Sequence, residues 1–166
     1  MLQSTNKVFS LKEKELTSQI RQLKHPIVFT NGCFDILHRG HTTYLETARN
    51  LGESLIVGVN SDTSVKRQNK GSDRPINNQA DRQAMLAALA CVDAVIVFNE
   101  DTPLKLIELI TPDILVKGGD WQIKDIIGAE HVKANGGKVH SIAFEHDRST
   151  TQLLEKIRLT QPVQTT

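Results

Sequence analysis

The chain has 166 residues, 39% of them hydrophobic and 23% charged, which is the size and composition of one ordinary globular domain. Its 20 Lys and Arg residues nearly balance its 19 Asp and Glu residues, giving a formal charge of +1. This balance, together with an aromatic content of 4%, argues against a nucleic-acid partner. No apolar run approaches the ~20 residues that span a bilayer, so we expect no membrane partner.

The two cysteines, Cys33 and Cys91, show no spacing typical of a metal site. The first 24 residues are mixed in character and contain no apolar signal core. We therefore expect a cytoplasmic protein with reduced thiols.

Helical and strand-like patterns alternate along the chain, and Gly, Pro and Asn residues punctuate them. In chain order we predict a helix over 10–23, a strand over 27–30, a helix over 42–51, a strand over 55–59, a helix over 78–90, a strand over 94–98, a helix over 103–110, a strand over 114–117, a helix over 126–134, a strand over 139–142 and a helix over 151–159. Short strands that alternate with helices indicate right-handed βαβ units.

The predicted fold is a single-domain α/β structure, a Rossmann-like doubly wound parallel sheet of five strands with helices on both faces. We expect one domain over residues 1–166, with a core over about 24–159, an N-terminal helix over 10–23 and a polar tail over 160–166. Such sheets bind ligands at the carboxyl ends of their strands. The segments after the five strands hold nearly all the unusual polar residues of the chain.

The first of these segments carries two histidines three residues apart, His38 and His41, with Gly40 between them. A dinucleotide-binding fold would show GxGxxG at this place, and this chain does not. Two imidazoles at the start of a helix, beside its unpaired N–H groups, suit a phosphate, and Gly40 lets a ligand approach the backbone. We favour this interpretation over two ordinary surface histidines.

At this point the sequence resembles a known family. The run from Gly32 to His41 is similar to the HxGH signature of the cytidylyltransferase-like nucleotidyltransferases. Further similar strings follow in family order at 58–67, 74–76, 81–82, 117–121 and 149–151. Over roughly residues 10–159 they most resemble the D-glycero-β-D-manno-heptose 1-phosphate adenylyltransferases, and we expect the stand-alone form because the chain has no room for a fused kinase.

The resemblance implies a role for each matching residue. His38, His41 and Lys66 would be catalytic. The nucleotide would be bound by Thr30, Asn31, Gly32, Cys33, Phe34, Gly40, Lys117, Gly118, Ser149, Thr150 and Thr151. The sugar phosphate would be bound by Asp35, Arg74, Arg82, Gly119, Asp120 and Trp121.

Several of these residues have alternatives that the sequence leaves open. Asp35 either helps to hold a metal or caps the turn, and we predict no other protein ligand for a metal. Arg74 and Arg82 either bind an anion or form salt bridges. Trp121 either stacks on a base or sugar or packs a hydrophobic corner. Asp147 is acidic where many relatives carry Gly, and it receives no role.

The implied reaction joins ATP and a sugar 1-phosphate, with Mg²⁺, to give ADP-heptose and pyrophosphate for lipopolysaccharide core biosynthesis. The attacking phosphate oxygen is already anionic, so the reaction needs no general base and no covalent intermediate. The alternatives are a cytidylyltransferase that acts on a polyol phosphate such as glycerol 3-phosphate, and a non-catalytic nucleotide-binding module. We also expect a homo-oligomer, a dimer or higher, with an apolar face from the helix over 78–90.

Overall fold

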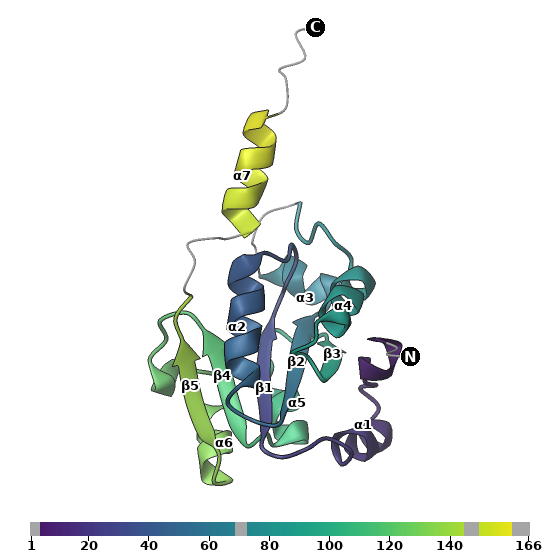
Figure 1. Cartoon of the computed structure of the whole chain (residues 1–166), viewed down its shortest axis with the longest axis vertical. Helices are drawn as coiled ribbons and strands as arrows, with labels where there is room; N and C mark the ends of the chain where they lie inside the picture. The colour runs from purple at the N-terminus through teal and green to yellow at the C-terminus, as the bar shows by residue number, and fades with distance from the viewer. Residues whose placement is uncertain (1–3, 69–72, 145–149, 161–166) are drawn as a thin grey trace, which may run out of the picture.

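Five parallel strands form the centre of the molecule in the computed structural model, which describes residues 4–68, 73–144 and 150–160 (Figure 1). The strands are β1 (Ile27–Gly32), β2 (Ser54–Asn60), β3 (Ala94–Phe98), β4 (Ile114–Gly118) and β5 (Lys138–Ile142). Their order across the sheet is β3-β2-β1-β4-β5, and every neighbouring pair is parallel. The order reverses between β1 and β4, which is the switch point where sheets of this kind bind ligands.

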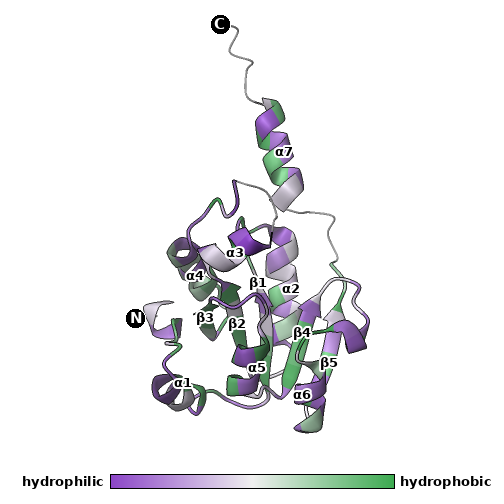
Figure 2. Cartoon of the chain, turned by 180° about the vertical axis from the view of Figure 1, so that it is seen from behind, coloured by the Kyte–Doolittle hydropathy of each residue, from purple (hydrophilic) through white to green (hydrophobic). Residues whose placement is uncertain are grey.

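Helices cover both faces of this sheet (Figures 1 and 2). The helices in the described residues are η1 (Ser4–Lys7), α1 (Glu13–Ile20), α2 (Arg39–Arg49), α3 (Asp62–Arg67), α4 (Gln79–Ala88), α5 (Leu104–Ile110), η2 (Ile123–Asp125), α6 (Ala129–Ala134) and α7 (Thr150–Thr160), of which α7 does not pack on the sheet. One apolar core lies between the sheet and α2 with α4, and a second lies between the sheet and α1, α5 and α6. The prediction of a doubly wound parallel sheet is confirmed.

Strand alternation decides which face each side chain of β1 and β4 reaches. Phe29 and Leu115 belong to the core on the α5 and α6 side, whereas Val28 and Val116 belong to the core on the α2 side. Because successive side chains point to opposite faces, Asn31 continues the row of Phe29 on the α5 and α6 side. Polar side chains at the ends of β1 and β4 can therefore lie on either face of the sheet, according to their position in the strand.

Two of the differences between the predicted and the observed elements concern the carboxyl edge of the sheet. The sequence prediction missed α3, a six-residue helix that Ser61 caps by accepting a hydrogen bond from the Ser64 N–H. Helix α2 begins at Arg39 instead of residue 42, so His41 lies in its first turn and His38 is its N-cap. His38 has extended backbone, which suits an N-cap although its side chain makes no capping hydrogen bond.

Helices α4 and α7 use their apolar residues differently. Helix α4 buries Leu86 and Ala87 against the sheet, so the apolar face that we expected to serve an oligomer is used inside the chain. Oligomeric state therefore stays a prediction. Helix α7 projects from the body of the molecule and buries no residue (Figure 1), and Ile157 on it is exposed. Arg158 contacts the carboxylate of Asp73.

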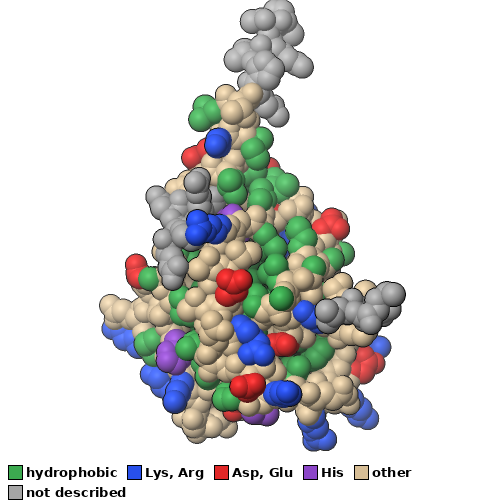
Figure 3. All heavy atoms as spheres, in the orientation of Figure 1, with side chains coloured by type: hydrophobic (Ala, Val, Ile, Leu, Met, Phe, Trp, Pro, Cys, Tyr) green, Lys and Arg blue, Asp and Glu red, His purple; other side chains and the backbone are tan. Residues whose placement is uncertain are grey.

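Charges of both signs are interspersed on the face that Figure 3 shows, and no single basic field covers it. No helix in the described part of the chain combines the length and the apolar character that a bilayer span requires.

Candidate active site

The two histidines of the first strand-to-helix turn stack on each other at the start of α2. The ring centroids of His38 and His41 lie 3.8 Å apart, with 25° between the ring planes. The ring of Phe34 meets His41 edge-on at a centroid distance of 5.3 Å. Phe34 has a φ of 47°, the left-handed region that a bulky residue rarely adopts. Strain of this kind collects at functional turns.

Both histidine rings contain a buried nitrogen without a partner. The Nδ1 atoms of His38 and His41 are buried and accept or donate no hydrogen bond among the described residues. An unpaired buried polar atom costs about 1–3 kcal/mol, so it needs an explanation such as a ligand, an ion or a catalytic role. The histidine pair is the one place among residues 4–68, 73–144 and 150–160 with such side-chain atoms.

The environment of the pair keeps both rings neutral near neutral pH. Burial and, to a smaller extent, the neighbouring ring of His38 lower the pKa of His41 to about 4, and a hydrogen bond to the Ile36 backbone opposes this shift only weakly. Burial also lowers the pKa of His38. A neutral imidazole keeps one N–H donor and one acceptor nitrogen. Each neutral ring can therefore donate one hydrogen bond to an oxygen anion.

A cavity of about 110 Å³ opens beside these rings on the α2 side of the sheet. Its lining comes from the turn after β1, from α2 and from the ends of β4 and β5. The lining residues are Asn31, Gly32, Cys33, Phe34, His41, Tyr44, Lys117, Gly118 and Phe144. The fold thus brings six of the predicted nucleotide-binding residues, from β1, the turn after it and β4, to one cavity with His41.

Glycine is required where β4 closes this cavity. A Cβ atom at Gly118 would lie 2.7 Å from the Phe144 ring and 3.2 Å from the Tyr44 ring. Neither aromatic residue was predicted to belong to the site. Tyr44 lies one turn after His41 on α2, which is the sequence signal that could have identified it.

A buried carboxylate fixes the turn that carries the pair. Asp35 is 1% exposed and accepts hydrogen bonds from Arg74 Nε at 2.6 Å, Ile76 N at 3.0 Å and Asn77 N at 2.9 Å. Its backbone oxygen accepts from the Asn77 side chain. Of the two alternatives that the sequence left open, this geometry supports the structural one, because both carboxylate oxygens are already used.

Arg82 completes the support and has no exposed surface. Its guanidinium donates to the carbonyl oxygens of Asn77 at 3.0 Å and Cys33 at 2.7 Å, and to Asp62 Oδ1 at 2.8 Å. These bonds join α4, the turn after β1 and the first residue of α3. Arg74 is 8% exposed and paired with Asp35, so both arginines form the salt bridges that the sequence left open as an alternative. Their predicted contact with the sugar phosphate stays a prediction.

Comparisons with known proteins identify the family of the chain. The model of the family described as cytidylyltransferase-like matches residues 29–159. The chain belongs to the cytidylyltransferase-like family. It is 52% identical over 153 residues to a protein of Bordetella bronchiseptica named D-beta-D-heptose 1-phosphate adenylyltransferase, covering 92% of this chain and 94% of that protein.

Other relatives of this cytidylyltransferase-like protein are longer. It is 55% identical over 152 residues to the bifunctional protein HldE of Haemophilus influenzae, covering 90% of this chain and 32% of that protein. Among solved structures, a lipopolysaccharide core biosynthesis protein of Thermoplasma volcanium is 31% identical with a TM-score of 0.58, covering 74% of this chain and 98% of that one. A pantoate-beta-alanine ligase of Francisella tularensis, 14% identical with a TM-score of 0.57, shares the fold.

The other predicted site residues of this cytidylyltransferase-like protein lie at several places. Thr30 is fully buried and its hydroxyl pairs with Tyr44 Oη at 2.6 Å, so its side chain packs the core instead of reaching a nucleotide. Gly40 is buried in the first turn of α2. Lys66 has an exposed side chain in the last turn of α3, after β2. Asp120 is exposed in the turn after β4.

The threonines predicted to bind nucleotide, Thr150 and Thr151, begin α7 and make no hydrogen bond to either histidine in the described part of the chain. Ser149 and Asp147 lie outside the described residues.

No group of three or more His, Cys, Asp and Glu residues is placed to hold a metal ion within the described ranges. Asp35, the alternative ligand that the sequence suggested, faces Arg74 and two backbone N–H groups. These residues do not form a site for a resident Mg²⁺ ion.

The lowered pKa of His41 predicts how the stability of the fold depends on pH. Between pH 6.5 and about 4 the unfolded chain binds a proton at this ring that the folded chain does not. The free energy of unfolding should therefore fall as the pH drops through this window, by on the order of 2–3 kcal/mol from this group. Urea unfolding at pH 7, 5.5 and 4 measures the slope.

In this experiment His41→Asn should flatten the pH dependence, whereas His131→Asn on α6 should keep the wild-type slope. Equal slopes for wild type and His41→Asn would contradict the assignment of the buried neutral ring.

Proposed function

We propose that this protein transfers AMP from ATP to D-glycero-β-D-manno-heptose 1-phosphate, giving ADP-heptose and pyrophosphate for the lipopolysaccharide core. The observation that carries the proposal is the stacked, half-buried His38–His41 pair at the start of α2, whose buried Nδ1 atoms have no partner among the described residues. The name of the Bordetella bronchiseptica relative supports the choice of substrate. We propose a cytoplasmic site of action because ATP is the donor.

The phosphates of ATP would lie between the histidine pair and the first turn of α2. Backbone N–H groups at a helix start have no partner within the helix, and the helix dipole favours an anion there. His38 and His41 would donate hydrogen bonds to oxygens that gain charge as the α-phosphorus reacts. Each neutral imidazole has one N–H group, so each ring can supply one hydrogen-bond donor to the phosphates.

Bond exchange at the α-phosphorus needs positioning more than proton transfer. An oxygen of the acceptor phosphate attacks the α-phosphorus, the bond to the β-phosphate oxygen breaks, and pyrophosphate leaves with the electron pair. The attacking oxygen is anionic near neutral pH, so no base is required. We propose that Mg²⁺ arrives bound to ATP and offsets charge on its phosphate oxygens. Lys66, exposed beside the carboxyl edge, would contact the leaving pyrophosphate.

A substrate panel tests the function directly. The purified protein is incubated with each of ATP, CTP, GTP and UTP, paired with heptose 1-phosphate or with glycerol 3-phosphate, and pyrophosphate is measured. We expect release only from ATP with the sugar phosphate. Release from CTP with glycerol 3-phosphate would replace the proposal by a cytidylyltransferase. Nucleotide binding without pyrophosphate from any pair would indicate a binding module.

His41→Ala should lower kcat by about 10²–10³, the usual effect of removing one donor to the transition state. The far-UV circular dichroism spectrum should be unchanged. His131→Ala, which removes a histidine from α6 outside the site, serves as the matched control. A kcat within a few-fold of wild type for His41→Ala would remove the pair from the mechanism.

Lys66→Ala should reduce kcat more than it raises the KM for ATP, because its contact strengthens as charge develops on the leaving group. Steady-state kinetics at saturating sugar phosphate separates the two constants. Lys14→Ala on α1 removes a comparable charge from a remote helix and should change neither. A raised KM for ATP with an unchanged kcat would instead indicate that Lys66 binds ATP equally in the ground state and the transition state.

A further inference from the structure

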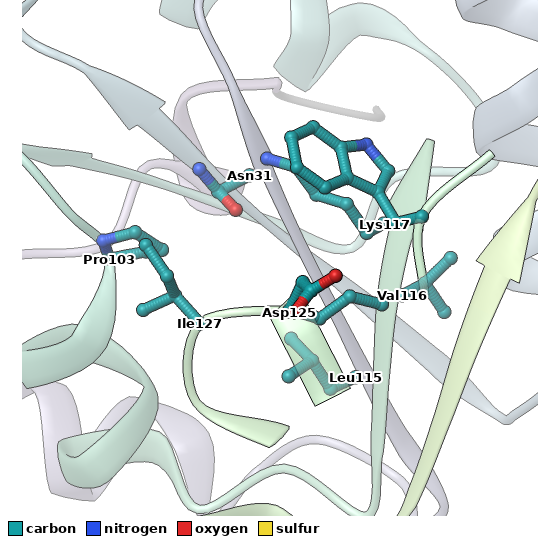
Figure 4. Close-up of a pocket in the computed structure, with 9 residues that line it drawn as sticks. Asn31, Pro103, Leu115, Val116, Lys117, Asp125 and Ile127 are labelled. Carbon is teal, nitrogen blue, oxygen red and sulfur yellow. The ribbon is translucent and has the colours of Figure 1, made fainter. Parts of the chain in front are cut away.

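A second cavity lies at the switch point, on the face of the sheet opposite the histidine pair. It has a volume of about 120 Å³ and is formed by β1, β4, the start of α5 and the segment around η2. Its lining residues are Asn31, Pro103, Leu115, Val116, Lys117, Trp121, Asp125, Ile126 and Ile127. Figure 4 shows Asn31 and Lys117 along its upper side, with Asp125 and Leu115 below them.

The two cavities share a wall. Asn31 and Lys117 line both the cavity beside His41 and this second cavity, and each is the last residue but one of its strand, β1 or β4, at the reversal of strand order. A group lying against Asn31 and Lys117 is therefore reachable from both faces of the sheet.

The geometry of the reaction assigns different substrates to the two sides. In a displacement at phosphorus the attacking and leaving oxygens lie roughly in line, on opposite sides of the phosphorus atom. If the histidine pair and α2 hold the phosphates of ATP, the attacking phosphate approaches from the opposite side, across Asn31 and Lys117. We infer that the second cavity holds the sugar of the acceptor, with Asp125 accepting hydrogen bonds from its hydroxyl groups.

Charge orients the sugar phosphate within this cavity. Lys117 stands at the wall shared with the histidine side, where an acceptor phosphate would meet it. Asp125 would repel that phosphate and so faces the other end of the molecule. Asp125 is exposed, and its carboxylate has no hydrogen bond or ion pair with any residue in the described ranges, so its oxygens can accept hydrogen bonds from hydroxyl groups.

The remaining walls suit the apolar face of a sugar ring. Leu115 and Ile126 are buried residues of its lining, and Trp121 in the same lining is 49% exposed. The indole is held in place because its Nε1 donates to the Gly118 carbonyl at 3.1 Å and its backbone N–H donates to Ser141 Oγ at 3.0 Å. A mostly apolar pocket with a few directed polar groups is typical of small-molecule sites.

This inference rests on the proposed function, and Trp121 allows it to be tested separately. Trp121 is the sole tryptophan of the chain, so its fluorescence reports on this cavity without interference from other indoles. The sugar phosphate is titrated into the protein in the presence of a non-hydrolysable ATP analogue. We expect a saturable change in Trp121 emission for heptose 1-phosphate and none for inorganic phosphate.

Asp125→Ala should raise the half-saturating concentration of heptose 1-phosphate in this titration, and its KM in turnover, by about 10–100-fold. The KM for ATP should stay within two-fold. Ile127→Phe, which narrows the same cavity without changing charge, should also raise the KM for the sugar phosphate alone. Glu130→Gln removes an exposed carboxylate from α6 and is the matched control.

The outcomes separate this inference from the proposed function. Product formation by wild type together with an unchanged KM for sugar phosphate in Asp125→Ala would overturn the inference and keep the function. A higher KM for ATP in Asp125→Ala would overturn it in favour of a nucleotide in this cavity. A saturable Trp121 response without product would uphold the inference and remove the function.

Discussion

The buried carboxylate of Asp35 is the interaction on which the candidate site depends. It accepts hydrogen bonds from Arg74 and from the N–H groups of Ile76 and Asn77, so it fixes the turn after β1 against the segment that leads into α4. Arg82 extends the network to α3. Removing one partner of a buried pair typically costs about 3–5 kcal/mol, because the other charge stays buried without compensation. The network thus holds Phe34 at its positive φ and keeps His41 beside it.

The histidine pair gains its properties from burial in this supported turn. Two stacked rings in water would each titrate near pH 6.5, and they would carry charge over part of the physiological range. Burial of His41 lowers its pKa to about 4, so the ring stays neutral. Neutral rings can stack closely, whereas two imidazolium ions at 3.8 Å would repel each other. The buried Nδ1 atoms of His38 and His41, which have no partner among the described residues, destabilise the fold unless a ligand hydrogen-bonds to them.

The reversal of strand order between β1 and β4 gives the molecule two cavities with one wall in common. The first lies on the α2 side beside His41, and the second lies on the α5 and α6 side beside Asp125. Asn31 and Lys117 separate them. Two ligands bound in these cavities would meet at this wall from opposite faces of the sheet. In-line transfer places the attacking and leaving oxygens on opposite sides of the phosphorus atom, and this arrangement allows that approach.

The sequence by itself determined the alternation of strands and helices, the parallel sheet and the family, because hydrophobic periodicity and the run around His38 and His41 are local signals. Only the tertiary structure decided the roles of Asp35, Arg74 and Arg82. Charged residues near a predicted loop look alike in sequence whether they bind a ligand or support the turn. Tyr44, Phe144 and Asp125 come from separate elements, and only the folded chain brings them to the linings of the two cavities. Burial and distance distinguish these cases, and both arise from contacts between residues far apart along the chain.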